Sequence, residues 1–323
     1  MMIRKIKLYI TLAAVALSAT SCLDKYPEDA ILEKDAMTTV EQANQVVVGI
    51  YSGFKNAPLY SGSLTLLPDL QADLAYAVTG YSNVYGDIWR WDILATNNEI
   101  TGVYGALYAI IGRCNFFLEN VDKVAANTVD DDKLDKLDEC KGEVYFARAL
   151  AYSELIKMFC KAYDPKTAAN GLGVALVSQY SNAPRPKRAS LKESYQFVLD
   201  DLARSAEYLA TDDDTEVIYN SAYFTIGTVN ALYARMYLYM RKWEKAVEYA
   251  TKVIDSKKYT LADATKNSYS VTYNDFAYMW QYDNSTEIIW KVMFEVNSYG
   301  GALGTVFLNY DYTSYKPDYV PAK

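Results

Sequence analysis

The sequence of 323 residues contains no histidine. Imidazole is the usual base of nucleophilic triads, a frequent general base and a common metal ligand. Its absence excludes every histidine-dependent triad, every histidine–metal site and every histidine general base. An enzyme that works with carboxylates alone, such as a glycosidase, is still allowed by the composition.

Cysteine is also scarce, with four in the whole chain. After the first one, Cys22, there are three, and an odd number does not complete a disulfide framework. Cys140 and Cys160 fall on one predicted helix, where a rise of about 1.5 Å per residue separates them by roughly 30 Å, too far for a bridge. With no histidine to assist, we interpret these two and Cys114 as small core residues rather than zinc ligands.

Positive charge is deficient, because 32 Lys and Arg face 40 Asp and Glu and leave a net charge of -8. Removing a leader that carries Arg4, Lys5 and Lys7 and no acid lowers this by three, to -11. Such a chain is poorly suited to nucleic acid or to a polyanionic ligand. The hydrophobic fraction of 51% is enough for a sizeable core and is not typical of disorder.

The N-terminus has the pattern of a secretory signal peptide over residues 1–21. Its apolar run, Leu8 to Leu17, is too short to span a membrane. Small residues lead directly to Cys22, which resembles the acylated cysteine of a bacterial lipoprotein. Residues 22–37 then predict a polar tether, and residues 38–323 the folded domain. The alternative is an ordinary signal peptide followed by a chance cysteine.

The most regular stretch is 141–161, KGEVYFARALAYSELIKMFCK. Its apolar residues recur at steps of three and four and form two stripes, Val144, Ala147, Ala151, Leu155 and Met158 in one and Tyr145, Tyr152, Ile156 and Phe159 in the other. A helix that is apolar on two sides is covered on two sides. The pattern predicts the central helix of an all-α array.

Other stretches show the same helical period. They are 64–77, 99–123, 38–55 with a capping-box spacing at Thr38 and Glu41, and 190–210 with the same spacing at Ser190 and Glu193. Residues 222–255 predict a helix–turn–helix of tetratricopeptide length, which must stack on neighbours to bury its faces. The β-branched and aromatic stretch 287–296 predicts a minor strand near the C-terminus.

Tyrosine is abundant, with 31 residues, and the loop 76–98 is especially aromatic. It has little helical periodicity and carries six candidate ligand-binding residues, Tyr81, Tyr85, Trp89, Trp91, Asn97 and Asn98. In an extended segment Trp89 and Trp91 share one face. An aromatic platform beside amides can stack on a sugar ring and bind its hydroxyls. The alternative is a loop whose tryptophans fill gaps in the helical core.

A second aromatic group surrounds the predicted strand. Its candidate binding residues are Trp280 and Tyr282, and it continues with Tyr299, Asn309, Tyr310, Tyr312, Tyr315 and Tyr319. This group is either a second part of a binding platform or a loop layer packed over the helices.

The stretch 142–152 also carries a resemblance to a known family. Seven of its residues, Gly142, Glu143, Tyr145, Phe146, Arg148, Ala149 and Tyr152, resemble the "GEA-x-F-x-RA-x-x-Y" helix of the SusD/RagB outer-membrane nutrient-binding lipoproteins of Bacteroidetes. Further similarities follow in the family's order: the lipoprotein cysteine, a first helix ending in Gly49-Ile50-Tyr51, Pro184-Arg185, Asp200-Asp201-Leu202, and the stretch 287–290.

The resemblance implies a SusD-like fold, a tetratricopeptide-like helical array with long aromatic loops. It also implies a lipid-anchored protein on the outside of the outer membrane, which captures oligosaccharide or polysaccharide without a cofactor or a reaction. Its expected partner is a SusC-like, TonB-dependent transporter, over which it acts as a lid, and no nucleic acid. Part of the family's glycan site lies in the loop matched by 76–98. Because family members extend well beyond the position matched by Lys323, we expect a C-terminal portion of the family fold to be absent.

Three other functions are compatible with the residues. A lipid-anchored glycosidase would need two catalytic carboxylates, and no acid in the sequence has an identifiably catalytic context. A peptide-binding member of the same family would use the same aromatic platforms. A repeat scaffold that binds only protein would leave Trp89, Trp91 and Tyr282 buried.

Overall fold

The computed structural model describes residues 35–181, 186–209, 222–295, 303–308, 314 and 316–322. The chain divides into two units, Met1–Ala36 and Met37–Lys323. The predicted signal peptide, Cys22 and nearly all of the tether lie outside the described residues. So do Pro184-Arg185 and several members of the second aromatic group, Tyr299, Asn309, Tyr310, Tyr312 and Tyr315.

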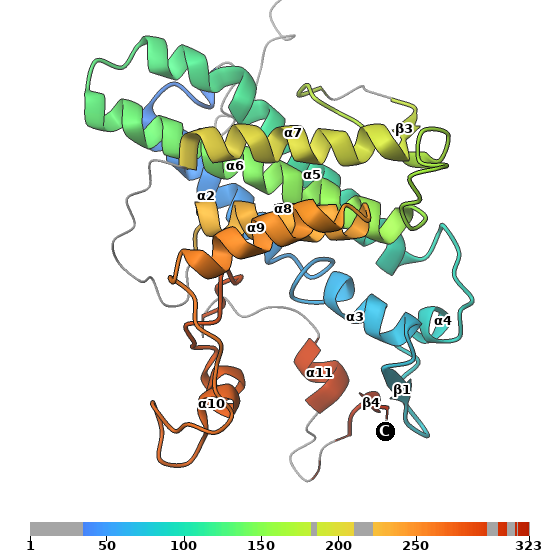
Figure 1. Ribbon diagram of the computed structural model, residues 1–323. Helices are drawn as coiled ribbons and strands as arrows, with labels where there is room; N and C mark the ends of the chain where they lie inside the picture. Colours follow the sequence, from blue (N-terminus) through green and yellow to red (C-terminus); the bar gives the residue numbers. More distant parts are fainter. Residues whose placement is uncertain are drawn as a thin grey trace, which may run out of the picture. The chain divides into compact units, whose positions relative to one another are not determined.

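The larger unit is built on a helical array of six helices: α2 (Val40–Phe54), α5 (Asn98–Ala126), α6 (Asp131–Phe159), α7 (Leu191–Leu209), α8 (Ile226–Tyr239) and α9 (Trp243–Asp255). Figure 1 shows α5 to α9 side by side with roughly parallel axes. α6 packs against α2, α5 and α7, and α8 packs against α7 and α9. The predicted all-α array is confirmed, and the helix–turn–helix expected over 222–255 is the pair α8 and α9.

α6 is the central helix, as the two apolar stripes predict. Every residue from Gly142 to Ile156 is buried except Tyr145, which is half-buried. A Cβ atom added at Gly142 would lie 2.7 Å from Cγ of Leu209, so this glycine lets α7 approach closely. The helix ends at Phe159, where Cys160 turns to an extended conformation.

A buried ion pair joins α6 to α7. The Arg148 guanidinium donates to both carboxylate oxygens of Asp201, from Nε at 2.8 Å and from Nη2 at 2.7 Å. Its third nitrogen, Nη1, donates to Oδ1 of Asn115 on α5 at 2.7 Å. Burial raises the pKa of Asp201, and the hydrogen bonds from Arg148 oppose that rise. Because the pair is satisfied on several sides, it fixes how three helices meet.

Two more residues of the 142–152 pattern hold neighbouring backbone. The Tyr152 hydroxyl accepts from the Val177 N–H at 2.7 Å and donates to the Val177 carbonyl at 3.1 Å. Burial raises the pKa of Tyr152 to about 12, so this hydroxyl keeps its proton. The Tyr51 hydroxyl donates a hydrogen bond to the Glu143 carboxylate at 3.1 Å. The same hydroxyl oxygen of Tyr51 accepts a hydrogen bond from the Phe224 N–H at 2.7 Å. These residues are therefore structural.

Shorter elements form a second hydrophobic cluster beside the array. They are α3 (Ser63–Gln71), β1 (Ala75–Ala77), α4 (Gly86–Trp89), α11 (Leu303–Leu308) and β4 (Tyr319–Pro321). β1 pairs antiparallel with β4, with Tyr76 opposite Val320. Five buried residues make up what we call the minor core, Leu66, Leu70, Ala75, Val306 and Tyr319. A second hairpin-like pair joins β2 (Leu172–Ala175) to β3 (Arg188–Ser190), and α10 spans Asp275–Tyr282.

Local details correct two predictions. The capping box of α2 is one residue later than expected, formed by Thr39 and Gln42 instead of Thr38 and Glu41, whereas that of Ser190 and Glu193 is confirmed. The strand predicted over 287–296 is wrong for its described part, since no strand covers 287–295. The stretch instead places the half-buried Trp290 against the rings of Phe54, Tyr60 and Phe224, and these contacts cover part of its apolar surface. The described minor strand near the C-terminus is β4.

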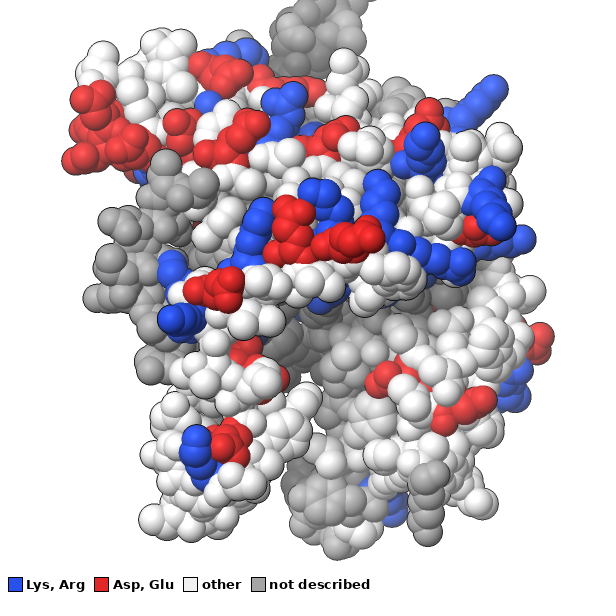
Figure 2. All heavy atoms as spheres, in the orientation of Figure 1, with Lys and Arg blue, Asp and Glu red and all other residues white. Residues whose placement is uncertain are grey.

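The polar and apolar surfaces are unevenly distributed. Figure 2 shows Lys, Arg, Asp and Glu over α5, α7 and α9, whereas the surface over α3 and α10 is mostly uncharged.

Cys114, Cys140 and Cys160 are all free thiols. Within the described ranges, no helix is both long enough and apolar enough to cross a membrane.

Candidate functional site

The predicted binding loop folds into a compact segment. We call residues 75–98 the α4 segment, which runs from β1 through a turn and α4 to the start of α5. Tyr85 precedes α4 in a left-handed conformation, with φ of 54°, and its hydroxyl lies 3.2 Å from Oγ of Ser63. Tyr85 therefore holds the α4 segment against α3.

Trp89 and Trp91 do not share a face, contrary to the extended conformation expected from the sequence. Trp89 is the last residue of α4, and its ring meets Tyr81 and Tyr319 edge-on, with centroids 5.9 and 6.4 Å away. It packs against the minor core. Trp91 has a φ of 62° and is 61% exposed. Trp91 is the more exposed of the two, because Trp89 is half-buried and the left-handed turn at Trp91 sends the chain in a new direction.

A polar network lies beside Trp91. Nη1 of Arg90 donates to the Tyr81 hydroxyl at 2.6 Å and to Oδ1 of Asn83 at 2.9 Å. Its Nη2 donates to Asp87 at 2.8 Å, and Asn97 donates to the other oxygen of that carboxylate at 3.4 Å. The network is exposed, and its groups are the donors and acceptors that sugar hydroxyls bind. Sequence reasoning missed Asp87 and Arg90, although their i, i+3 spacing is visible.

The remaining candidates lie apart. Asn98 is the exposed first residue of α5. Trp280 and Tyr282 lie on α10 and are 74% and 55% exposed. Their ring contacts are with Phe276, Tyr273 and Tyr278, and in the described part of the chain no ring contact joins them to the α4 segment. The structure thus gives two exposed aromatic regions and not one continuous platform.

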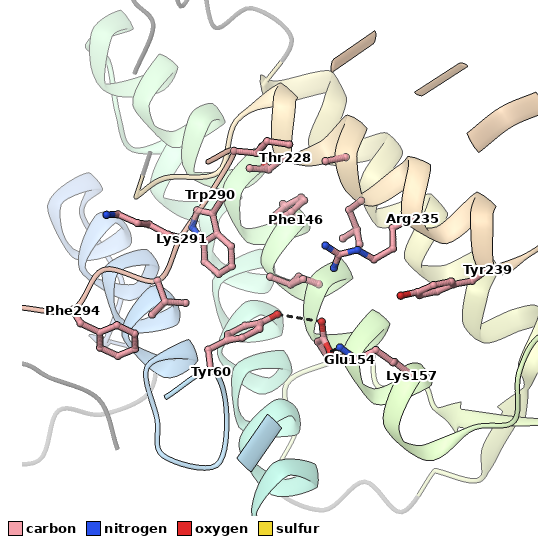
Figure 3. Close-up of a pocket in the computed structure, with 15 residues that line it drawn as sticks. Tyr60, Phe146, Glu154, Lys157, Thr228, Arg235, Tyr239, Trp290, Lys291 and Phe294 are labelled. Atoms are coloured by element: carbon pink, nitrogen blue, oxygen red, sulfur yellow. Dashed lines mark hydrogen bonds and ion pairs between the residues drawn. The ribbon is translucent and has the colours of Figure 1, made fainter. Parts of the chain in front are cut away.

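A cavity of about 730 Å³, which sequence reasoning missed, lies between α6, α8, Tyr60 and residues 289–294. Figure 3 shows Trp290 and Tyr60 on one side, and Arg235 and Tyr239 of α8 on the other. Because these residues come from four separate parts of the chain, no local pattern could reveal them. A cavity of this volume can hold a small ligand.

The floor of the cavity carries a buried carboxylate. Glu154 is 2% exposed and accepts from the Tyr60 hydroxyl at 3.2 Å. Lys157, one helical turn later, forms an ion pair with the same carboxylate. Burial and the nearby Glu154 charge raise the pKa of Tyr60 well above its ordinary value. Among the described residues that line the cavity, Glu154 is the one acid.

Comparisons with known proteins agree with this architecture. A SusD-like family model, described as "Starch-binding associating with outer membrane", matches residues 22–238. SusD-like protein P2 of Formosa agariphila is 24% identical over 255 residues, which cover 79% of this chain and 47% of that protein. This chain therefore spans about half the length of that curated relative.

Solved structures show the same fold. A SusD superfamily protein of Bacteroides thetaiotaomicron has a TM-score of 0.73 at 20% identity, covering 88% of this chain and 60% of that one. A SusD-like carbohydrate binding protein of Bacteroides vulgatus has a TM-score of 0.58 at 17% identity, covering 70% and 47%. Since the family model spans two thirds of the sequence and the fold agrees throughout the array, the chain belongs to the SusD-like family.

Proposed function

We propose that this protein captures oligosaccharide or polysaccharide at the cell surface and delivers it to a TonB-dependent, SusC-like transporter of the outer membrane. Membership in a family described as starch-binding and associated with the outer membrane supports this. The leader and Cys22 support attachment through a lipid anchor, because acyl chains bury methylene groups worth about 0.8 kcal/mol each.

The observation that carries the proposal is the exposed indole of Trp91 next to a fixed polar network. The indole of Trp91 is 61% exposed and can therefore contact a ligand without any change in the fold. An indole face can stack on the C–H face of a pyranose ring. Asp87 and Asn97, which are held by Arg90 and by each other, can then bind the hydroxyls at the sugar's edge.

Capture requires no reaction. Arg90 forms an ion pair with Asp87 at 2.8 Å, and the paired carboxylate can still accept hydrogen bonds from sugar hydroxyls. The glycan is held by stacking and hydrogen bonds and is then released to the transporter. Trp280 and Tyr282 offer a separate exposed aromatic region that can stack on further sugar rings.

The test is a glycan-array screen of the protein beginning at Cys22, together with the variant Trp91→Ala. We expect binding to a defined polysaccharide, weakened about tenfold or more in the variant, since loss of an aromatic contact of about 1.5 kcal/mol corresponds to a factor of ten. The matched control is Trp243→Ala, which removes a tryptophan of similar exposure, 57%, from α9.

Two results would contradict the proposal in different ways. Unchanged binding by Trp91→Ala would remove the site from the α4 segment while leaving glycan capture intact. Failure of the folded protein to bind any glycan, with binding to a peptide library instead, would make peptide the cargo.

A further inference from the structure

The cavity between α6 and α8 contains one cation that is not neutralised. Lys157 pairs with Glu154, and Lys291 pairs with Asp283 at 2.7 Å. Arg235 lines the same cavity and has no ion pair or hydrogen bond among the residues that the structure describes. Figure 3 shows its guanidinium reaching from α8 toward Trp290 and Tyr60. The cavity therefore carries a local charge of about +1 within an acidic protein.

The walls around Arg235 are aromatic. Trp290 is fixed by a hydrogen bond from its Nε1 to the Ala222 carbonyl at 3.2 Å and by Phe224, with ring centroids 5.0 Å apart. Tyr239 and Phe294, which also line the cavity, are 41% and 39% exposed. A rigid indole opposite a partly exposed phenol is suited to a flat ligand with apolar C–H faces, such as a sugar ring.

We propose that this cavity is a second glycan subsite, which selects a sugar residue bearing a carboxylate, that is, a uronic acid. The proposal rests on glycan capture as the protein's function and adds a preference that the α4 segment does not provide. The sugar ring lies between Trp290 and Tyr239, and its carboxylate accepts two hydrogen bonds from Arg235. Guanidinium and carboxylate match in this paired geometry.

The charges in the cavity favour a uronic acid over a free amino acid. A zwitterion would bring its own ammonium group, and the carboxylate that could receive it, Glu154, is already paired with Lys157. A uronic acid brings one negative charge to Arg235, which is exposed and is unpaired among the described residues that line the cavity. The sugar's hydroxyls can be bound by the Lys157 ammonium, whose side chain is 39% exposed.

The net charge of the protein restricts the ligand further. A long polyanion would be repelled by a chain of charge -8, and this repulsion extends over about a Debye length, roughly 8 Å at physiological salt. A cavity of about 730 Å³ also holds only a few sugar rings. The subsite therefore accepts the end of a glycan or a short fragment.

The test is titration calorimetry with trigalacturonate and with its fully methyl-esterified form. The ester keeps the rings and removes the charges, so we expect it to bind about 10- to 100-fold more weakly than the acid. We expect Arg235→Gln to reduce the affinity for the acid by a similar factor and to leave the affinity for the ester unchanged. Arg235→Lys keeps the charge but not the paired geometry, so its affinity for the acid should lie between that of the unchanged protein and that of Arg235→Gln.

Three controls locate the effect. Arg241→Gln removes the same charge from an exposed position outside the cavity and should change nothing. Trp91→Ala should weaken binding of the glycan identified on the array and leave trigalacturonate binding unchanged. Addition of trigalacturonate should shift the indole N–H resonance of Trp290, which can be assigned by its loss in Trp290→Phe.

Equal affinity for acid and ester, or unchanged binding by Arg235→Gln, would overturn the subsite. Loss of trigalacturonate binding in Trp91→Ala alone would place the acid on the α4 segment and would also overturn it. Either result leaves the proposed function standing as long as the array glycan still depends on Trp91. If the protein binds no glycan at all, both proposals fall.

Discussion

Tyrosines are placed differently in the helical array and in the α4 segment. In the array, Tyr51 and Tyr152 are covered by protein and their hydroxyls bond to the backbone of Phe224 and Val177. In the α4 segment, the Tyr81 hydroxyl is at the surface and accepts from an exposed arginine. A buried phenol must satisfy its hydroxyl with protein, whereas an exposed one can offer it to a ligand. The residue type is the same, and the partner decides its role.

The largest expected difference in stability is between the loss of a buried arginine and the loss of an exposed one. Arg148→Ala leaves the buried Asp201 carboxylate without its partner, so we expect the free energy of unfolding to fall by about 3–5 kcal/mol. Urea unfolding followed by circular dichroism measures this. Arg113→Ala, which removes one hydrogen bond to the Gly49 carbonyl from an exposed side chain, should cost about 1 kcal/mol. Equal losses for the two variants would mean that the buried pair does not hold the array together.

The two neighbouring tryptophans test the α4 segment itself. Trp89→Ala empties a place against the minor core, and we expect a loss of stability of about 2–3 kcal/mol. Trp91→Ala should change stability by less than about 0.5 kcal/mol, since surface substitutions rarely do more. Thermal unfolding of both variants under identical conditions separates them. A larger loss for Trp91→Ala would reverse the assignment of structural and binding roles.

Replacing either of two glycines of long helices by alanine should change the free energy of unfolding, but with opposite signs. At Gly142 an added Cβ would overlap the Leu209 side chain, so Gly142→Ala should destabilise by about 1–3 kcal/mol. At Gly112 of α5 an added Cβ meets nothing within 4 Å, so Gly112→Ala should stabilise by about 0.5–1 kcal/mol. Chemical unfolding of both variants decides this. The same sign at both positions would show that helix propensity outweighs the close contact of α6 and α7.

The smallest effect concerns a surface ion pair. Glu41 lies 2.7 Å from Lys133, and the hydrogen bond from that lysine lowers the pKa of Glu41 from 4.5 to about 2. A carboxylate with a lowered folded-state pKa stabilises the protein above pH 4.5 and loses this contribution as the pH falls toward 2. The urea midpoint of Glu41→Gln should therefore lie slightly below that of the unchanged protein at pH 6 and coincide with it near pH 2. A difference that persists at pH 2 would rule out this pair as its source.

Long periodic helices could be predicted from the sequence because their burial repeats locally. The stripes of 141–161 identified α6 and its central position, and a spacing of three residues identified the cap of α7. The α2 cap was misplaced by one residue because Thr38 and Thr39 are both capping residues and both have an acceptor three residues later.

The binding regions could be predicted only in part. The aromatic content of 76–98 indicated an unusual loop, but the split between Trp89 and Trp91 depends on Tyr319, which is far along the chain. The stretch 287–296 had the composition of a strand, yet its Trp290 is half-buried against Phe54 and Phe224, and its neighbours line a cavity. Tertiary partners decided both cases, and partners distant in sequence leave no local signal.

The pairing of β1 with β4 has a consequence for the order of events during synthesis. Ala75–Ala77 can pair only after Tyr319–Pro321 has been made, and Trp89 gains its contact with Tyr319 at the same time. Closing so long a loop costs chain entropy that local helices do not lose. The array can therefore form before residues 319–321 are made, whereas the α4 segment gains its contacts with them later. The surface that displays Trp91 thus depends on a pairing between distant parts of the chain.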